Sequence, residues 1–93
     1  MFTNAEIINS ESVNGRMQLT IQGIFHAIEN IECYESKLYI HFDRINKTRR
    51  MTEMVLLNKA SGSYESVKGM YDEEFEEKIV EAAINKIHFK QSA

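Results

Sequence analysis

The chain has 93 residues, of which 43% are hydrophobic and 27% are charged, and its formal net charge is -3. This length and composition indicate one globular domain over residues 1–93, and they exclude a disordered or fibrous chain. The negative net charge argues against a surface built throughout for nucleic-acid phosphates, although a local basic patch is compatible with it.

The single cysteine, Cys33, excludes an internal disulfide, and its spacing from the histidines does not resemble a zinc site. The first residues lack a basic segment followed by an apolar run, and no apolar stretch has the length that spans a bilayer. We therefore expect a cytoplasmic protein with no membrane contact, metal or cofactor. The absence of proline and the abundance of Ile, Lys, Asn and Glu are typical of an AT-rich genome, such as that of a low-GC bacterium or its phage.

The strongest turn signal is Asn14-Gly15, because both residues tolerate the positive φ of a two-residue hairpin turn. It predicts a first β-hairpin. Residues 9–12 are polar on both faces, which suits an edge strand that resists aggregation. The predicted cross-strand pairs are Val13 with Arg16, Ser12 with Met17, Ser10 with Leu19 and Ile8 with Ile21.

Residues 24–33 are ambiguous between strand and helix. Ile24, Ile28 and Ile31 have helical spacing, whereas the β-branched content of the segment and its position after a hairpin favour a strand. We interpret the segment as a strand.

Residues 37–43 alternate in the manner of a half-buried strand, with Leu38 and Ile40 on one face and Tyr39 and His41 on the other. Asn46-Lys47 predicts a second tight turn, followed by a strand to about residue 57. A loop over residues 59–63 leads to a short strand over residues 64–67. The predicted pairs of the second hairpin are Ile45 with Thr48, Asp43 with Arg50, Phe42 with Met51 and Leu38 with Val55.

Residues 72–89 predict one amphipathic helix. Asp72 is a competent N-cap, and glutamates fill the first turns, where the helix dipole favours negative charge. One face carries apolar side chains at three- and four-residue spacing, and such a face needs a partner. These apolar residues are Phe75, Ile79, Ala82, Ala83 and Ile87.

These elements together predict an α+β domain. Four to five antiparallel strands form a meander, and the C-terminal amphipathic helix packs on one face of the sheet. A partly closed barrel is the alternative arrangement of the same strands.

One helix covers only one face of such a sheet, so apolar residues on the other face need a partner. Strand alternation places Tyr39, Met54 and Leu56 toward that uncovered face, together with His41. We therefore expect a small non-enzymatic protein-interaction module that uses this face or the free sheet edge. A second copy is the simplest partner, because a two-fold pairing needs only one self-complementary surface.

Single-stranded nucleic-acid binding is the first alternative function. Arg44, Lys47, Arg49 and Arg50 concentrate positive charge around the second turn, near aromatic strand residues. Such a combination can hold phosphates and stack bases. Polar turns are commonly basic, however, and Asp43 is placed to neutralise Arg50.

A small enzyme is the second alternative. His26, His41 and Cys33 are the side chains whose ordinary chemistry suits proton transfer or nucleophilic attack near neutral pH. Sequence spacing alone places none of them beside another, and a lone strand histidine is more often a hydrogen-bonded surface residue than a general base. We therefore assign no catalytic, cofactor-binding or metal-binding residue.

Overall fold

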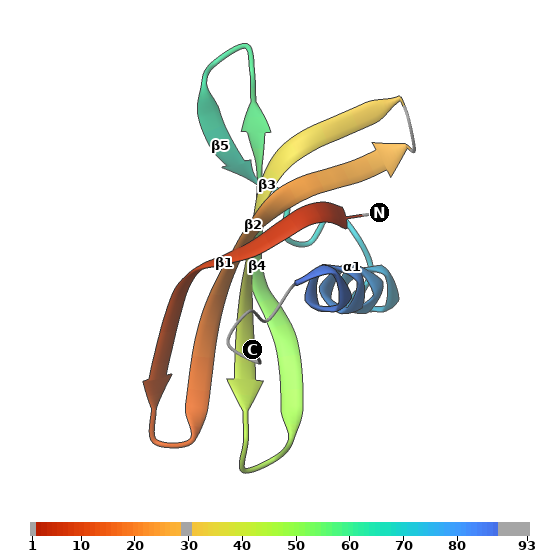
Figure 1. Ribbon diagram of the computed structural model, residues 1–93. Helices are drawn as coiled ribbons and strands as arrows, with labels where there is room; N and C mark the ends of the chain where they lie inside the picture. The colour runs from red at the N-terminus through yellow and green to blue at the C-terminus, as the bar shows by residue number, and fades with distance from the viewer. Residues whose placement is uncertain (1, 29–30, 88–93) are drawn as a thin grey trace.

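The computed structural model describes residues 2–28 and 31–87, which form an open five-stranded antiparallel sheet with helix α1 against one face (Figure 1). The strands lie side by side in chain order, so the predicted meander and helix are confirmed, and the sheet is not closed into a barrel. The elements are β1 (Phe2–Val13), β2 (Arg16–Ile28), β3 (Glu32–Asp43), β4 (Thr48–Asn58), β5 (Ser63–Ser66) and α1 (Glu73–Lys86).

The first hairpin turns at Asn14 and Gly15, as predicted, with φ values of 51° and 81°. The predicted pairs from Val13–Arg16 to Ser10–Leu19 are confirmed. The pairing of Ile8 with Ile21 is wrong, because a bulge leaves Ile8 as the extra residue on β1 and brings Ile7 opposite Ile21.

Residues 24–33 contain strand, as we interpreted them, but not one continuous strand. β2 ends at Ile28 and β3 begins at Glu32, so the segment includes a hairpin connection. Residues 29–30 lie outside the described part of the chain. The helix-like spacing of Ile24, Ile28 and Ile31 does not produce a buried face, because Ile28 and Ile31 are exposed near the end of this hairpin.

The predicted register of the second hairpin is wrong in all four pairs. The chain turns over four residues, 44–47, and Asp43 pairs with Thr48. The Asp43 carboxylate accepts hydrogen bonds from the backbone N–H groups of Ile45 and Asn46, at 2.9 and 3.1 Å, and so stabilises this longer turn. In the observed register Ile40 lies opposite Met51, and His41 rather than Asp43 lies opposite Arg50.

A bulge in β4 changes which side chains reach the core. Tyr39 pairs with Glu53 and Ile40 with Met51, so Thr52 is the extra residue. As a result Met51 and Met54 are both buried, although simple alternation would put them on opposite faces. The prediction that Met54 faces away from the helix is therefore wrong.

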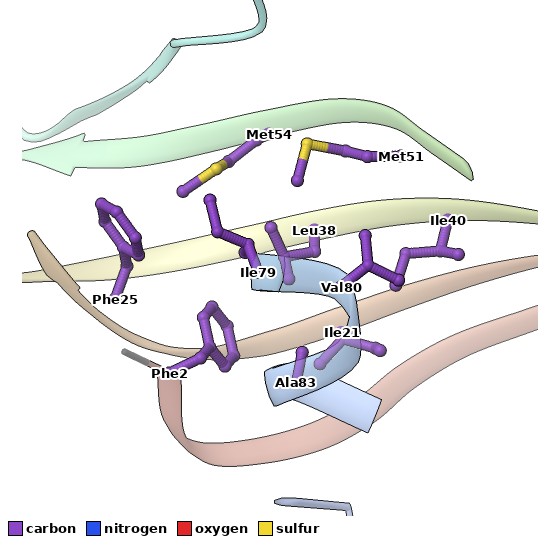
Figure 2. Packing of buried hydrophobic residues seen from close by; sticks show 10 residues of the cluster. All are labelled: Phe2, Ile21, Phe25, Leu38, Ile40, Met51, Met54, Ile79, Val80 and Ala83. Carbon is purple, nitrogen blue, oxygen red and sulfur yellow. The ribbon is translucent and has the colours of Figure 1, made fainter. Parts of the chain in front are cut away.

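The hydrophobic core lies between α1 and the sheet. Ile79, Val80 and Ala83 are fully buried and lie among side chains from β1, β2, β3 and β4 (Figure 2). The helix begins at Glu73, and the predicted N-cap is confirmed, because the Asp72 carboxylate accepts a 2.8 Å hydrogen bond from the Phe75 N–H. The helix ends at Lys86, before the predicted end at Phe89, which lies outside the described residues. The core cluster consists of Phe2, Ile21, Phe25, Leu38, Ile40, Met51, Met54, Ile79, Val80 and Ala83.

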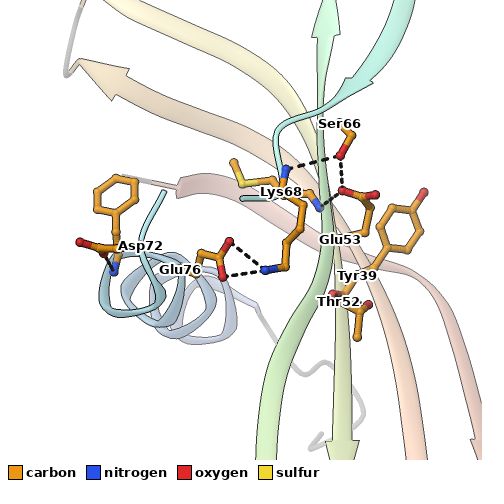
Figure 3. Close-up of polar contacts among 9 residues, drawn as sticks. Tyr39, Thr52, Glu53, Ser66, Lys68, Asp72 and Glu76 are labelled. Atoms are coloured by element: carbon orange, nitrogen blue, oxygen red, sulfur yellow. Dashed lines mark hydrogen bonds and ion pairs between the residues drawn. The ribbon is translucent and has the colours of Figure 1, made fainter. Parts of the chain in front are cut away.

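Polar contacts also attach the helix to the sheet. Lys68 Nζ donates to both carboxylate oxygens of Glu76 at 3.0 and 3.1 Å, and Glu76 is itself buried (Figure 3). Ser66 donates to Glu53 on the neighbouring strand and accepts from the Lys68 backbone N–H. A short polar chain therefore runs from β4 through β5 to the first turns of α1.

Two hairpin ends project beyond the helix at one end of the sheet (Figure 1). They contact each other, since the Arg44 N–H donates to the Gly15 carbonyl at 3.0 Å and the Ile45 side chain lies over Gly15. Among the described residues, no helix is long and apolar enough to cross a membrane.

Candidate functional site

The sheet face away from α1, called here the open face, is mainly polar. Because Ile21, Leu38 and Ile40 point to the helix, their neighbours along each strand point the other way. Paired residues across the sheet then form rows on the open face. The row nearest the hairpin ends contains Arg16, Asp43 and Thr48. The second row contains Glu11, Gln18, His41 and Arg50, and the third contains Asn9, Thr20, Tyr39 and Glu53.

The four residues predicted to form an apolar interaction face do not lie together. Tyr39 and His41 are half-buried on the open face. Met54 is only 1% exposed within the core, and Leu56 packs against that core on the helix side, opposite the buried Ser36. The predicted assignment of Met54 and Leu56 to the uncovered face is wrong, because the Thr52 bulge reverses the alternation after Met51.

The predicted basic cluster is divided between the two faces. Arg49 points to the helix side, where its Nε and Nη2 donate to Glu77 Oε1 at 3.3 and 3.2 Å. Arg50 is exposed on the open face opposite His41. Arg44 and Lys47 are exposed on the turn between the strands.

The structure adds Arg16 to the positive charge on the open face. Arg16, His41 and Arg50 line a cavity of about 370 Å³, together with Asp43, Thr48 and Arg49. An adjoining groove of about 530 Å³ contains Arg16 and His41 again. Sequence reasoning missed Arg16 because its proximity to the second hairpin follows from the β2–β3 pairing, which no turn signal specified.

Asp43 remains ionised beneath these cations. Hydrogen bonding from the Asn46 backbone N–H is the main cause that lowers the pKa of Asp43 below its ordinary value. The Asn46 side chain, the Ile45 N–H and the Arg16 charge act in the same direction, and desolvation acts against them. Arg16 Nε lies 4.0 Å from Asp43 Oδ2, so this carboxylate partly balances one guanidinium.

His26 and Cys33 form a second polar cluster at the other end of the open face. They are cross-strand neighbours, and Cys33 Sγ lies 3.2 Å from His26 Nδ1. Thr3 Oγ1 lies 2.8 Å from the other ring nitrogen, Nε2, and so helps to orient the imidazole. His41 is separate, since it pairs with Gln18, eight residues from His26 along β2. The structure thus brings together two of the three residues named for the enzyme alternative, in an arrangement in which the imidazole can accept the thiol proton.

The free edge of β1 is a further candidate. β1 has twelve residues and pairs with β2 alone in the described part of the chain. From Glu6 to Val13 every residue is exposed, and Ile7 and Ile8 are 37% and 45% exposed. The opposite edge is formed by β5, which has four residues, and by residues 48–54 of β4, which β5 does not pair.

Within the described residues, no three His, Cys, Asp or Glu side chains converge on a point where a metal ion would fit. Comparison with models of protein families, with curated proteins and with solved structures finds no match to this chain.

Proposed function

We propose that this protein is a protein-interaction module that works through the free edge of β1, and that its partner is a second copy of the same chain. The observation that carries the proposal is the length and exposure of that edge. Natural sheets usually keep edge strands short or cover them, because unpaired backbone N–H and C=O groups recruit another strand. β1 has twelve residues, about twice the usual strand length, although irregularities between Thr3 and Glu6 and at Ile8 interrupt its ladder with β2.

A symmetric antiparallel pairing suits the sequence of β1. If two β1 strands pair about Ile8, with its bulge at the two-fold axis, Glu6 of one copy lies near Ser10 of the other, and Glu11 lies near Ala5. Like charges then do not meet directly, and Ile8 packs against its own counterpart on the two-fold axis. Backbone hydrogen bonds would supply affinity along the edge, and the exposed isoleucines would add apolar contact.

The short edge at β5 is a poorer place for strand addition. β5 offers only four residues and continues directly into the Ser66 and Lys68 contacts that hold α1. The rest of this edge, residues 48–54 of β4, carries the Arg49 contact with Glu77 of α1. A partner strand there would gain few backbone hydrogen bonds. The two edges therefore differ in a way that favours β1.

Sedimentation analysis of the purified chain at tens of micromolar tests the proposal. We expect a species of twice the 10.8 kDa chain mass. Ile8→Lys should give the monomer with an unchanged thermal midpoint, because this side chain is exposed in the single chain and would place two like charges at the two-fold axis. Met70→Lys is the matched control, since Met70 is exposed in the loop before α1, and it should leave the dimer intact.

Two outcomes would overturn this proposal. One is a monomer of the unaltered chain throughout the concentration range. The other is a dimer that Ile8→Lys leaves intact and Tyr39→Glu disrupts, because that result would place the contact on the open face instead of the edge.

A further inference from the structure

We propose that Arg16, His41 and Arg50 form a site on the open face for the phosphate groups of single-stranded nucleic acid. The three side chains come from β2, β3 and β4, and they line one cavity of about 370 Å³. The three residues are not neighbours in the sequence. Their convergence is a consequence of the sheet register, in which Gln18, His41 and Arg50 form one row and Arg16 begins the next.

The site has the donors that phosphate recognition requires. Arg16 is 63% exposed along its side chain, and Arg50 is exposed. Each guanidinium presents parallel N–H donors that match two phosphate oxygens. The His41 Nδ1 lies 3.4 Å from the Gln18 amide oxygen, so Nε2 donates to an oxygen ligand only when the ring carries both protons.

The acidic residues near the site do not cancel its positive charge. Asp43 directs its oxygens to the turn, where three hydrogen bonds occupy them, and its side chain is only 12% exposed. Glu11 lines the adjoining groove beside Arg16. Arg44 and Lys47, on the turn beside Asp43 and Thr48, add two more exposed cations. Four basic residues therefore face two carboxylates at this end of the sheet.

The neighbouring row favours a nucleic-acid strand over a small free phosphate. Tyr39 lies two residues along β3 from His41 on the same face, and it is half-buried. An aromatic ring next to a phosphate-binding row is the arrangement by which sheet surfaces stack an unpaired base while cations hold the backbone.

Fluorescence anisotropy with a labelled single-stranded deoxythymidine oligonucleotide tests the assignment. We expect binding at low salt that weakens linearly on a double-logarithmic salt plot, with a slope of about -0.7 for each phosphate contact. Arg16→Gln and Arg50→Gln should each weaken binding by about tenfold and flatten the slope by roughly one contact. Tyr39→Ala should weaken binding without changing the slope, because stacking releases no counterions.

Lys59→Gln is the matched control. It removes one positive charge from the exposed β4–β5 turn, which does not line the cavity, and it breaks no ion pair found in the structure. Its affinity should stay close to that of the unaltered chain. Unchanged circular dichroism and thermal midpoints confirm that each variant is folded.

The proposal fails if the oligonucleotide does not bind at low salt. It also fails if Lys59→Gln weakens binding as much as Arg50→Gln, since the attraction would then be general rather than local. Saturable binding of inorganic phosphate, measured by titration calorimetry, without oligonucleotide binding would replace the nucleic-acid assignment with a small phosphate ligand. Ile8→Lys should retain oligonucleotide binding, so failure of the β1-edge dimer and failure of this site are distinguishable.

Discussion

Asp43 sets the geometry of the second hairpin because its carboxylate accepts three hydrogen bonds inside the turn, from the Ile45 and Asn46 backbones and from the Asn46 side chain. Lys47 takes a positive φ of 54°, which completes the four-residue loop. The sequence favours Asn46-Lys47 as a two-residue turn. The longer loop could not be predicted, because it depends on hydrogen bonds from the Ile45 and Asn46 N–H groups to the Asp43 carboxylate, which only the folded backbone brings within reach.

Replacement of Asp43 by Asn should reduce stability in a pH-dependent way. The folded protein lowers the pKa of Asp43 below its ordinary value near 3.8. The ionised carboxylate therefore stabilises the fold above that ordinary value, and this contribution is lost as pH falls through the lower, folded value. Urea unfolding at about pH 7 should show a clear deficit for Asp43→Asn, and the deficit should shrink toward about pH 3. An equal difference between the two proteins at both pH values would contradict this account.

Gly23 is required by a close approach between β1 and β2. A Cβ atom at this position would lie 2.8 Å from the Thr3 carbonyl oxygen and would also collide with the Phe2 ring. The clash involves backbone, so a rotamer change cannot relieve it. Gly23→Ala should therefore destabilise the fold by about 1–3 kcal/mol, as overpacking generally does.

Gly62→Ala provides the comparison for Gly23. Gly62 has a φ of +73°, but a Cβ atom there meets nothing within 4 Å. The cost should be limited to backbone strain of about 1 kcal/mol. Chemical denaturation of both variants measures the difference, and an equal or larger loss for Gly62→Ala would contradict the contact described at Gly23.

The Thr3, His26 and Cys33 cluster shows why individual residues could be named from the sequence but not assembled. His26 and Cys33 were recognisable by their chemistry. Their contact depends on the tip of the β2–β3 hairpin, where the sequence offers no strong turn signal, and on the β1–β2 register after two irregularities. The geometry of the β2–β3 hairpin and the β1–β2 register are both determined by packing across the sheet.

The local sequence pattern predicts a helix, strand or turn correctly wherever one periodicity or one turn signal dominates the segment. The Asn14-Gly15 turn, the alternating strand over residues 37–43 and the capped helix were all predictable. The bulges at Ile8 and Thr52 were not, because an extra residue in one strand leaves no signature in its composition. The Thr52 bulge had the largest consequence, since it moved Met54 and Leu56 from the predicted interaction face to the helix side.

The contribution of α1 to the core is testable by truncating one buried side chain. Ile79 is fully buried within the core cluster, so Ile79→Ala removes apolar contacts and leaves a cavity. The free energy of unfolding should fall by about 2–5 kcal/mol. Glu81→Ala, on the exposed side of the same helix, should change it by no more than about 0.5 kcal/mol. Urea midpoints that moved equally would show that the helix does not bury its Ile79 face.

The layers of the molecule are as predicted, but the chemistry of its second surface is not. One helix covers one face of the sheet, and within residues 2–28 and 31–87 nothing covers the opposite face (Figure 1). That face is polar and carries Arg16, His41 and Arg50 where an apolar patch was expected. The proposed roles therefore separate, with self-association at the β1 edge and phosphate recognition on the open face.

The architecture also predicts a gradient of local stability along the strands. Helix α1 buries Ile21, Leu38 and Ile40 in the middle of the sheet, whereas the ends of the β1–β2 and β3–β4 hairpins extend past it (Figure 1). Opening a backbone hydrogen bond beneath the helix must break apolar packing, but opening one near Ser12 or Thr48 breaks much less. Amide hydrogen exchange followed by NMR should therefore be slowest under the helix and faster toward the hairpin ends. Ile79→Ala should reduce this protection most in the middle of the sheet, and uniform protection along β2 and β3 would contradict the gradient.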